Sequence, residues 1–215
     1  PLAHGRADEE VTFADAGRSG GMEAAARRAR YDFLRSVCRA AGASTLCTAH
    51  HLDDQVETVA MRVLSGSEGV LLAGMPAQRS LGDGITVERP LLGVGRAEIA
   101  QYVRERNLPW ATDRTNVEKA YRRNTVRNAI LPVAETLWPA IRSDLLRVSA
   151  ATEERRLDIE GRAATIPRTI RADTAEIERA AFFAAEPEVR LHLLYTTFRD
   201  LGLLSRADRP SHRFF

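Results

Sequence analysis

The sequence predicts an α/β fold, with a parallel-sheet domain followed by an all-helical accessory domain. Residues 46–49 form a short apolar run that is typical of a strand end. Directly afterwards, apolar residues recur at helical spacing from Val56 to Leu64. Beyond about residue 139 only helical patterns follow, and we identify no chemistry there. We therefore expect a parallel-sheet domain over residues 1–138 and a helical domain over residues 139–215.

A dense polar stretch, residues 48–58, lies between the predicted strand and helix. In open α/β sheets this turn lies at the carboxyl ends of the strands, where ligands bind. Asp53 or Asp54 can cap the helix, and both can face a cation or a nucleophile at its start. The capping, metal and catalytic interpretations are all open for this stretch. Its ionisable and amide side chains are His50, His51, Asp53, Asp54, Gln55 and Glu57.

The composition fits a soluble globular protein and excludes several classes. No apolar run reaches the roughly 18 residues of a membrane span, so we expect no membrane partner. Cys38 and Cys47 form no C-x-x-C motif, which argues against a structural zinc site and suits a reducing cytoplasm. Lys119 is the sole lysine beside many arginines, and guanidinium groups bind phosphate well.

Residues 19–24, Ser-Gly-Gly-Met-Glu-Ala, resemble the Ser-Gly-Gly-x-Asp-Ser pyrophosphate loop of PP-loop ATPases. The preceding residues are not a buried strand, and Glu23 and Ala24 replace the Asp and Ser, so we interpret the stretch as a glycine-rich helix entry. The helix then predicted over residues 22–41 buries a stripe at every fourth position, 25 to 41. Arg27 and Arg30 lie early in it, where a bound anion would offset their repulsion by the helix dipole. They are candidate phosphate ligands, or a solvated basic face.

A second polar cluster follows a predicted turn at 82–84, a strand near 85–87 and a helix over about 95–107. Arg123 and Arg127 are four residues apart and share a helical face. With Asn124 and Asn128 they form a surface able to bind phosphate oxygens. The alternative is a helix exit in which Asp113 pairs with an arginine.

Five motifs in this order resemble bacterial tRNA(Ile)-lysidine synthetase, a member of the PP-loop (adenine nucleotide alpha hydrolase-like) superfamily. The resemblance is strong over about residues 20–140 and weak beyond. The motifs are Ala26-Arg27-Arg28-Ala29-Arg30-Tyr31, Ala49-His50-His51-Leu52-Asp53-Asp54-Gln55-Val56-Glu57-Thr58, Arg89-Pro90-Leu91-Leu92, Asp113-Arg114-Thr115-Asn116 and Arg123-Asn124-Thr125-Val126-Arg127.

The resemblance implies a cytoplasmic two-step ligase. ATP, with Mg²⁺, adenylates the C2 oxygen of the wobble cytidine of tRNA(Ile), and free L-lysine then displaces AMP to give lysidine. A homodimer is a further expectation. The implied catalytic residues are His51, Asp53, Asp54 and Glu57, with Asp53 and Asp54 also as Mg²⁺ ligands. The implied ATP contacts are Arg27, Arg30, His50 and Arg123. The implied substrate or tRNA contacts are Arg89, Asp113, Asn116, Asn124 and Arg127.

The family's phosphate loop and its C-terminal domain have no counterpart in the sequence. We therefore expect a fragment of the enzyme that binds ATP poorly. Three alternatives remain: a tRNA-thiolating PP-loop enzyme, which would need paired cysteines; a non-catalytic RNA-binding module; and an HD-type metal hydrolase built on His51 and Asp53, which would need further ligands.

Overall fold

The computed structural model describes residues 22–110 and 122–204, with side chains from residue 25. The chain forms two compact units that are interleaved in sequence. The first, the sheet unit, contains Pro1–Leu52 and Pro76–Asn107. The second, the helical unit, contains Asp53–Met75 and Leu108–Phe215. The domain boundary at 138/139 stays a prediction, because each of these units combines two separate stretches of the chain and the units do not meet at a single residue.

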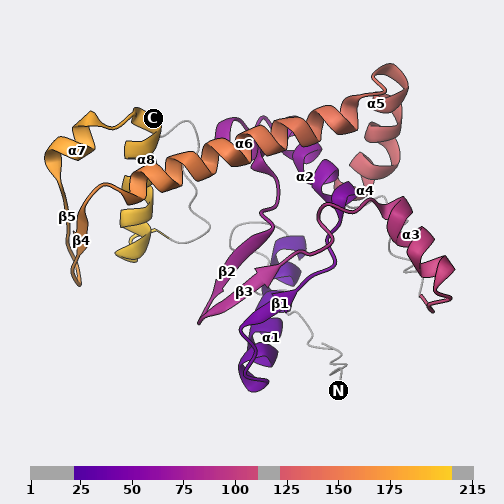
Figure 1. Cartoon of the computed structure of the whole chain (residues 1–215), viewed down its shortest axis with the longest axis horizontal. Coiled ribbons are helices and arrows are strands. Elements are labelled where there is room, and N and C mark those ends of the chain that lie inside the picture. Colours follow the sequence, from indigo (N-terminus) through magenta and orange to yellow (C-terminus); the bar gives the residue numbers. More distant parts are fainter. Residues whose placement is uncertain (1–21, 111–121, 205–215) are drawn as a thin grey trace. The chain divides into compact units, whose positions relative to one another are not determined.

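A three-stranded sheet forms the centre of the sheet unit, in the order β1-β3-β2 (Figure 1). Strand β1 (Thr45–Cys47) runs parallel to β3 (Ile85–Glu88), whereas β2 (Gln78–Gly82) runs antiparallel to β3. The α/β class is confirmed, but the described sheet is mixed, not wholly parallel. The cause is a tight hairpin at Gly82, Asp83 and Gly84, whose φ angles of 95°, 54° and 73° favour glycine.

Helix α1 (Met22–Ala40) packs against this sheet. Cys38 is buried with Leu81, Ile85 and Val87, and the ring of Tyr31 packs at the border of that cluster. The predicted stripe holds at Ala25 but fails at its end: Val37 is 36% exposed. Helix α3 (Arg96–Glu105) starts after Gly95, whose N–H donates to the Glu98 carboxylate at 2.7 Å.

The helical unit is organised around α2 (Leu52–Leu64) and the long helix α6 (Ile141–Ala164). Between them in sequence lie η2 (Gly69–Ala73), α4 (Arg122–Thr125), η4 (Val126–Ile130) and α5 (Leu131–Leu137). One face of α2 is buried against η4 and α6 because its apolar residues recur at helical spacing. This first core contains Val56, Val59, Ala60, Val126, Leu131 and Leu145.

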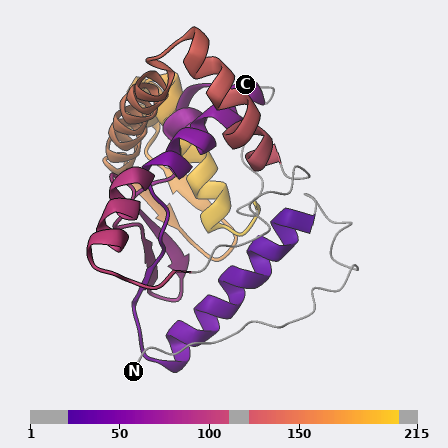
Figure 2. The same ribbon diagram turned by 90° about the vertical axis from the view of Figure 1, so that its right-hand side faces the viewer.

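A second core lies at the far end of α6, where α8 (Pro187–Asp200) packs alongside it (Figures 1 and 2). It contains Ile159, Ala163, Ile166, Val189 and Leu193. The all-helical prediction is wrong at one place: β4 (Arg168–Ile170) and β5 (Ala175–Ile177) form a hairpin before α7 (Arg179–Ala184). Three-residue strands are too short to show an alternating pattern. Within the described ranges, no helix has the length and apolarity to cross a membrane.

Candidate functional site

The carboxyl edge of the sheet unit fixes the loop that carries the two histidines. Because β1 and β3 are parallel neighbours, their carboxyl ends lie at the same edge. The Thr48 N–H donates to the Glu88 carbonyl at 2.9 Å, which extends the pairing past β1. The Thr48 hydroxyl lies 3.0 Å from Nδ1 of His50 and so orients that ring. The loop then leads through His51 directly into α2.

Arg89 follows β3 at the same edge, and it is only 4% exposed. Its Nη1 donates to the Pro76 carbonyl at 2.6 Å, and its backbone N–H donates to the Ala77 carbonyl at 2.9 Å. These bonds hold the segment before β2 against the segment after β3. The side chain therefore has a bracing role in the structure, and a direct tRNA contact by Arg89 stays a prediction.

The principal polar cluster lies in the helical unit, where Glu57 of α2 meets two arginines. The Glu57 side chain is 3% exposed. Arg123 Nε donates to Glu57 Oε2 at 2.9 Å. Arg127 donates to both carboxylate oxygens, from Nε at 2.5 Å and from Nη2 at 3.0 Å. One buried carboxylate thus fixes both guanidinium groups, and the Glu57 hydrogen bond raises the pKa of Arg127 above its usual value.

Asp54, one turn before Glu57, borders the same pair of arginines. Its Oδ1 lies 3.4 Å from Arg127 Nη2 and 3.5 Å from Arg123 Nη2. Arg123 Nη2 also donates to the backbone carbonyl of Asp54 at 3.2 Å. Since the distances to the Asp54 carboxylate are longer than those to Glu57, the arginines are anchored by Glu57 and only bordered by Asp54.

The local fold explains how the two arginines come to lie together. Arg123 and Arg127 are one helical turn apart across the junction of α4 and η4. The segment η4 is a π-helical turn, in which the Leu131 N–H donates to the Val126 carbonyl. Turns of this kind are rare in proteins, and those that occur are often found at functional sites. The shared face of the arginines was predicted, and the structure adds Glu57 as their common partner.

Asp53 is held separately, by a residue to which we assigned no role from the sequence. Arg142, near the start of α6, donates from Nη1 to Asp53 Oδ1 at 2.9 Å and from Nε to Glu135 of α5. Asp53 and Arg142 are 89 positions apart in the sequence, so no local spacing could have indicated the pair. The two adjacent aspartates therefore face different arginines.

Gln55 acts as a structural clamp within the same unit. Its Oε1 accepts a hydrogen bond from the Met75 N–H at 2.7 Å, and its Nε2 donates to the Met75 carbonyl at 3.1 Å. The preceding residue, Gly74, has φ of 75°, and a Cβ there would lie 2.6 Å from Gln55 Nε2. Ser149 of α6, 3% exposed, donates to the Ala73 carbonyl at 2.8 Å. These contacts fix η2 against α2 and α6.

The two aspartates do not fit a resident Mg²⁺ site. Asp53 faces Arg142, and Asp54 borders Arg123 and Arg127, so guanidinium groups already balance the charge of both carboxylates. Across residues 22–110 and 122–204, no three His, Cys, Asp or Glu side chains are grouped as metal ligands.

The remaining predicted residues divide into three groups. Arg27 and Arg30 are exposed on α1, and the guanidinium of Arg27 lies over the ring of Tyr31. Asn124 is partly buried on α4, beside Arg123 in sequence. Asp113, Asn116 and the glycine-rich residues 19–21 lie outside the described residues.

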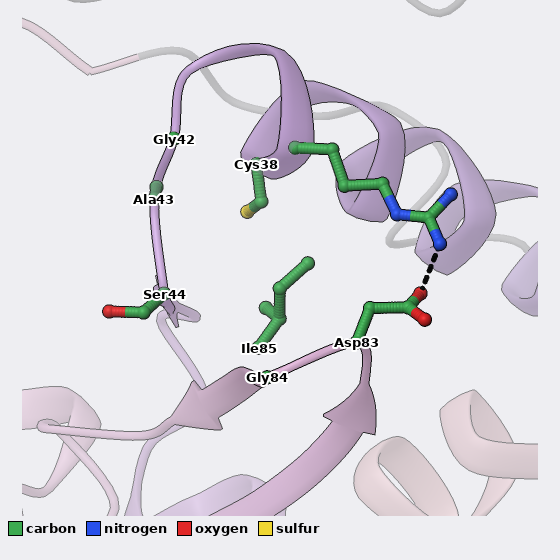
Figure 3. A pocket seen from close by; sticks show the side chains of 8 residues that line it. Cys38, Gly42, Ala43, Ser44, Asp83, Gly84 and Ile85 are labelled. Atoms are coloured by element: carbon green, nitrogen blue, oxygen red, sulfur yellow. Dashed lines mark ion pairs between the residues drawn. The ribbon is translucent and has the colours of Figure 1, made fainter.

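A small hollow in the sheet unit has a different character (Figure 3). It has a volume of about 260 Å³ and lies between the end of α1 and the β2–β3 turn. Its charged residues, Arg39 and Asp83, pair with each other at 2.7 Å. Cys38 at its wall is a free thiol, as is the exposed Cys47. Because its two charged residues pair with each other and the hollow is shallow, it is a poor candidate for a reaction site. The two free thiols give no support to thiolation chemistry.

Comparisons with known proteins agree with the motifs. A family model described as a PP-loop domain matches residues 4–134. The chain is 38% identical over 187 residues to the tRNA(Ile)-lysidine synthase of Burkholderia mallei. These aligned residues cover 85% of this chain and 38% of that protein. It is 37% identical over 214 residues to the tRNA(Ile)-lysidine synthase of Salinispora tropica, covering 98% of this chain and 63% of that protein.

The chain thus spans less than two thirds of the length of these relatives. The predicted resemblance to the tRNA(Ile)-lysidine synthetases is confirmed. The PP-loop match covers more than half of the 215 residues. On this ground the chain belongs to the PP-loop domain family.

Proposed function

We propose that the protein is an ATP-dependent tRNA ligase that joins L-lysine to C2 of the wobble cytidine of tRNA(Ile). Support comes from the names of its relatives and from the PP-loop match, which implies ATP binding. The single structural observation that carries the proposal is the Asp54–Glu57–Arg123–Arg127 cluster, the acid–arginine cluster. It places a carboxylate beside two fixed guanidinium groups.

That combination suits an amino-acid substrate because a free amino acid carries both signs of charge. Asp54 can accept hydrogen bonds from an ammonium group. Arg123 and Arg127 can donate to a carboxylate or to phosphate oxygens through N–H groups that Glu57 does not use. Glu57 itself is engaged by both arginines. In the proposal Glu57 positions the arginines and transfers no proton.

The reaction proceeds in two steps. The C2 oxygen of cytidine attacks the α-phosphorus of ATP, and pyrophosphate leaves. The side-chain amine of lysine then attacks C2, loses its proton and expels AMP. Both steps move negative charge onto phosphate oxygens, which fixed cations stabilise. Mg²⁺, when bound with the nucleotide, supplies further charge neutralisation; the geometry of Asp53 and Asp54 gives no support to a site held by these residues.

The other proposed roles rest on the motifs. His50, His51 and Arg30 are proposed contacts of the nucleotide, and Asn124 is a proposed contact of the tRNA. Asp53 is proposed to be oriented by Arg142. We propose that the reaction takes place in the cytoplasm, and a homodimer stays a prediction that sedimentation equilibrium would test.

The test is direct formation of lysidine. The purified protein is incubated with ATP, L-lysine and a tRNA(Ile) transcript, and the digested nucleosides are analysed by mass spectrometry. The expected product is cytidine enlarged by one lysine less water. Asp54→Asn should lower kcat/KM about 10- to 100-fold, because a charged hydrogen bond contributes roughly 1.5–3 kcal/mol. Asp32→Asn, on an exposed carboxylate of α1, makes the same charge change and should stay within about twofold of the unmodified protein.

The outcomes separate the candidate functions. Lysidine formation that requires all three substrates supports the ligase. Tight tRNA binding without any product would favour a non-catalytic RNA-binding protein instead. Equal activity of the Asp54→Asn and Asp32→Asn variants would refute the role of Asp54 while leaving the ligase assignment in place.

A further inference from the structure

We propose that Arg27, Tyr31 and Arg79, the arginine–tyrosine stack, form an RNA-contact site on the sheet unit. Arg27 Cζ lies 5.4 Å from the centroid of the Tyr31 ring, and Arg79 Cζ lies 5.1 Å from it. Both arginines are exposed, whereas the tyrosine is partly buried. The proposal relies on the proposed function only in taking tRNA as the RNA.

The stack is built on rigid elements. Tyr31 packs against the core cluster of the sheet unit, which fixes the plane of its ring. Arg27 lies one turn earlier on α1, so the two side chains share a helical face. Arg79 comes from β2, where it lies opposite Val87 in the ladder. Two guanidinium groups are therefore held against one fixed ring. Because folding has already ordered them, they lose less conformational entropy when a ligand binds.

The charge around the stack favours an anionic partner. Within the described residues, Arg27, Arg28 and Arg30 take part in no ion pair with a carboxylate. Asp32, which follows Tyr31 on α1, lies 3.3 Å from Arg35 instead. A planar guanidinium can bind a phosphate through its N–H edge and stack on an unpaired base through its face. A loop of RNA offers both groups side by side.

The position of the stack favours RNA over the phosphates of ATP. Nucleotide phosphates bind at a helix N-terminus, where the dipole acts over the first turn. Tyr31 lies nine residues after Met22, which is about 13 Å along the helix at 1.5 Å per residue. Arg79 lies on β2, at the edge of the described sheet. Phosphates that repeat along an RNA backbone can reach both elements.

The experiment measures tRNA binding and ATP binding for the same variants. Arg27→Gln and Arg79→Gln each remove one positive charge, and Arg39→Gln is the matched control. Arg39 lies on α1 as well, but its exposed guanidinium pairs with Asp83. Dissociation constants for tRNA are measured by fluorescence anisotropy over a salt series, and those for ATP by calorimetry. Melting temperatures confirm that each variant is folded.

We expect Arg27→Gln and Arg79→Gln each to weaken tRNA binding about 3- to 10-fold. Each should also reduce the slope of log K against log salt by about one, the value for one lost phosphate contact. ATP affinity should not change. Tyr31→Leu should weaken tRNA binding without removing a charge, whereas Tyr31→Phe, which retains the ring, should bind as the unmodified protein does. Arg39→Gln should remain within about twofold.

Three results would overturn the proposal. The first is that Arg27→Gln and Arg79→Gln both bind tRNA as tightly as Arg39→Gln does. The second is a loss of ATP affinity with unchanged tRNA affinity, which would assign Arg27 to the nucleotide. The third is an unmodified protein that does not bind tRNA. Lysidine formation is scored separately: a protein that binds tRNA through the stack but makes no lysidine refutes the ligase and supports this site.

Discussion

Replacement of Glu57 by glutamine is the sharpest test of the acid–arginine cluster. The substitution keeps the size of the side chain and removes its charge. Glu57 accepts three hydrogen bonds, at 2.9, 2.5 and 3.0 Å, from Arg123 and Arg127. In the variant the amide oxygen can still accept from one arginine, but the NH₂ group faces donors of the other. One guanidinium therefore loses its principal acceptor.

The expected cost follows from burial. Removing one partner of a fully buried ion pair costs about 3–5 kcal/mol. Here the carboxylate is 3% exposed, but the arginine side chains are 27% and 25% exposed, so water screens part of the effect. We expect Glu57→Gln to lower the free energy of unfolding by about 2–4 kcal/mol. For a chain of this size, that corresponds to a fall of roughly 4–16 °C in melting temperature.

Urea denaturation and thermal melting measure this loss, and Glu153→Gln supplies the matched control. Glu153 also holds an arginine through two hydrogen bonds, from Arg156 Nε and Nη2 at 2.7 and 2.8 Å. Its side chain is 28% exposed, so its pair should contribute less than about 1 kcal/mol. The reasoning fails if the two glutamine variants lose the same stability, because burial would then not distinguish the two pairs.

Three further predictions concern the helical unit. Gly74→Ala should lose about 1–3 kcal/mol more than Gly66→Ala in urea denaturation: both glycines have positive φ, but only at Gly74 would the new Cβ meet Gln55. Ser149→Ala should lose about 1–2 kcal/mol in the same assay, because it leaves a buried carbonyl of η2 without its donor. Burial lowers the pKa of His192 below its value of 6.5 in the unfolded chain. The unfolded state therefore takes up the proton first, and stability should fall as pH drops below about 6.5; melting curves of His192→Gln should show a smaller fall.

The sequence predicted those features that depend only on residues close together in the chain. The burial of Val56, Val59 and Ala60 follows from a helical period that needs no knowledge of partners. The expected cap at Asp53 or Asp54 is wrong, because α2 begins at Leu52 and both aspartates lie in its first turn. The same pattern fails at the end of the helix, where Val63 and Leu64 are 48% and 59% exposed. Burial there depends on what packs against the helix, and the sequence of α2 does not contain that information.

The partners of the polar residues could not be predicted for the same reason. The spacing of Arg123 and Arg127 correctly indicated a shared face, but their binding to Glu57 depends on how two distant segments pack. From the sequence alone, Glu57, Arg123 and Arg127 are therefore assigned to catalysis or to ligands, although in the structure these side chains bind each other. Arg142 lay outside every motif, and its contact with Asp53 depends on how α6 packs.

The π-turn at η4 also sets the phase of everything that follows it. Val126 and Leu131 are five residues apart, yet both are buried in the same core, at 4% and 2% exposure. In a regular α-helix, five residues correspond to a rotation that misses the starting direction by about 140°. The wide turn absorbs that mismatch. Without the wide turn, a regular α-helix over the same residues could thus present either the arginines or Leu131 in the right direction, but not both.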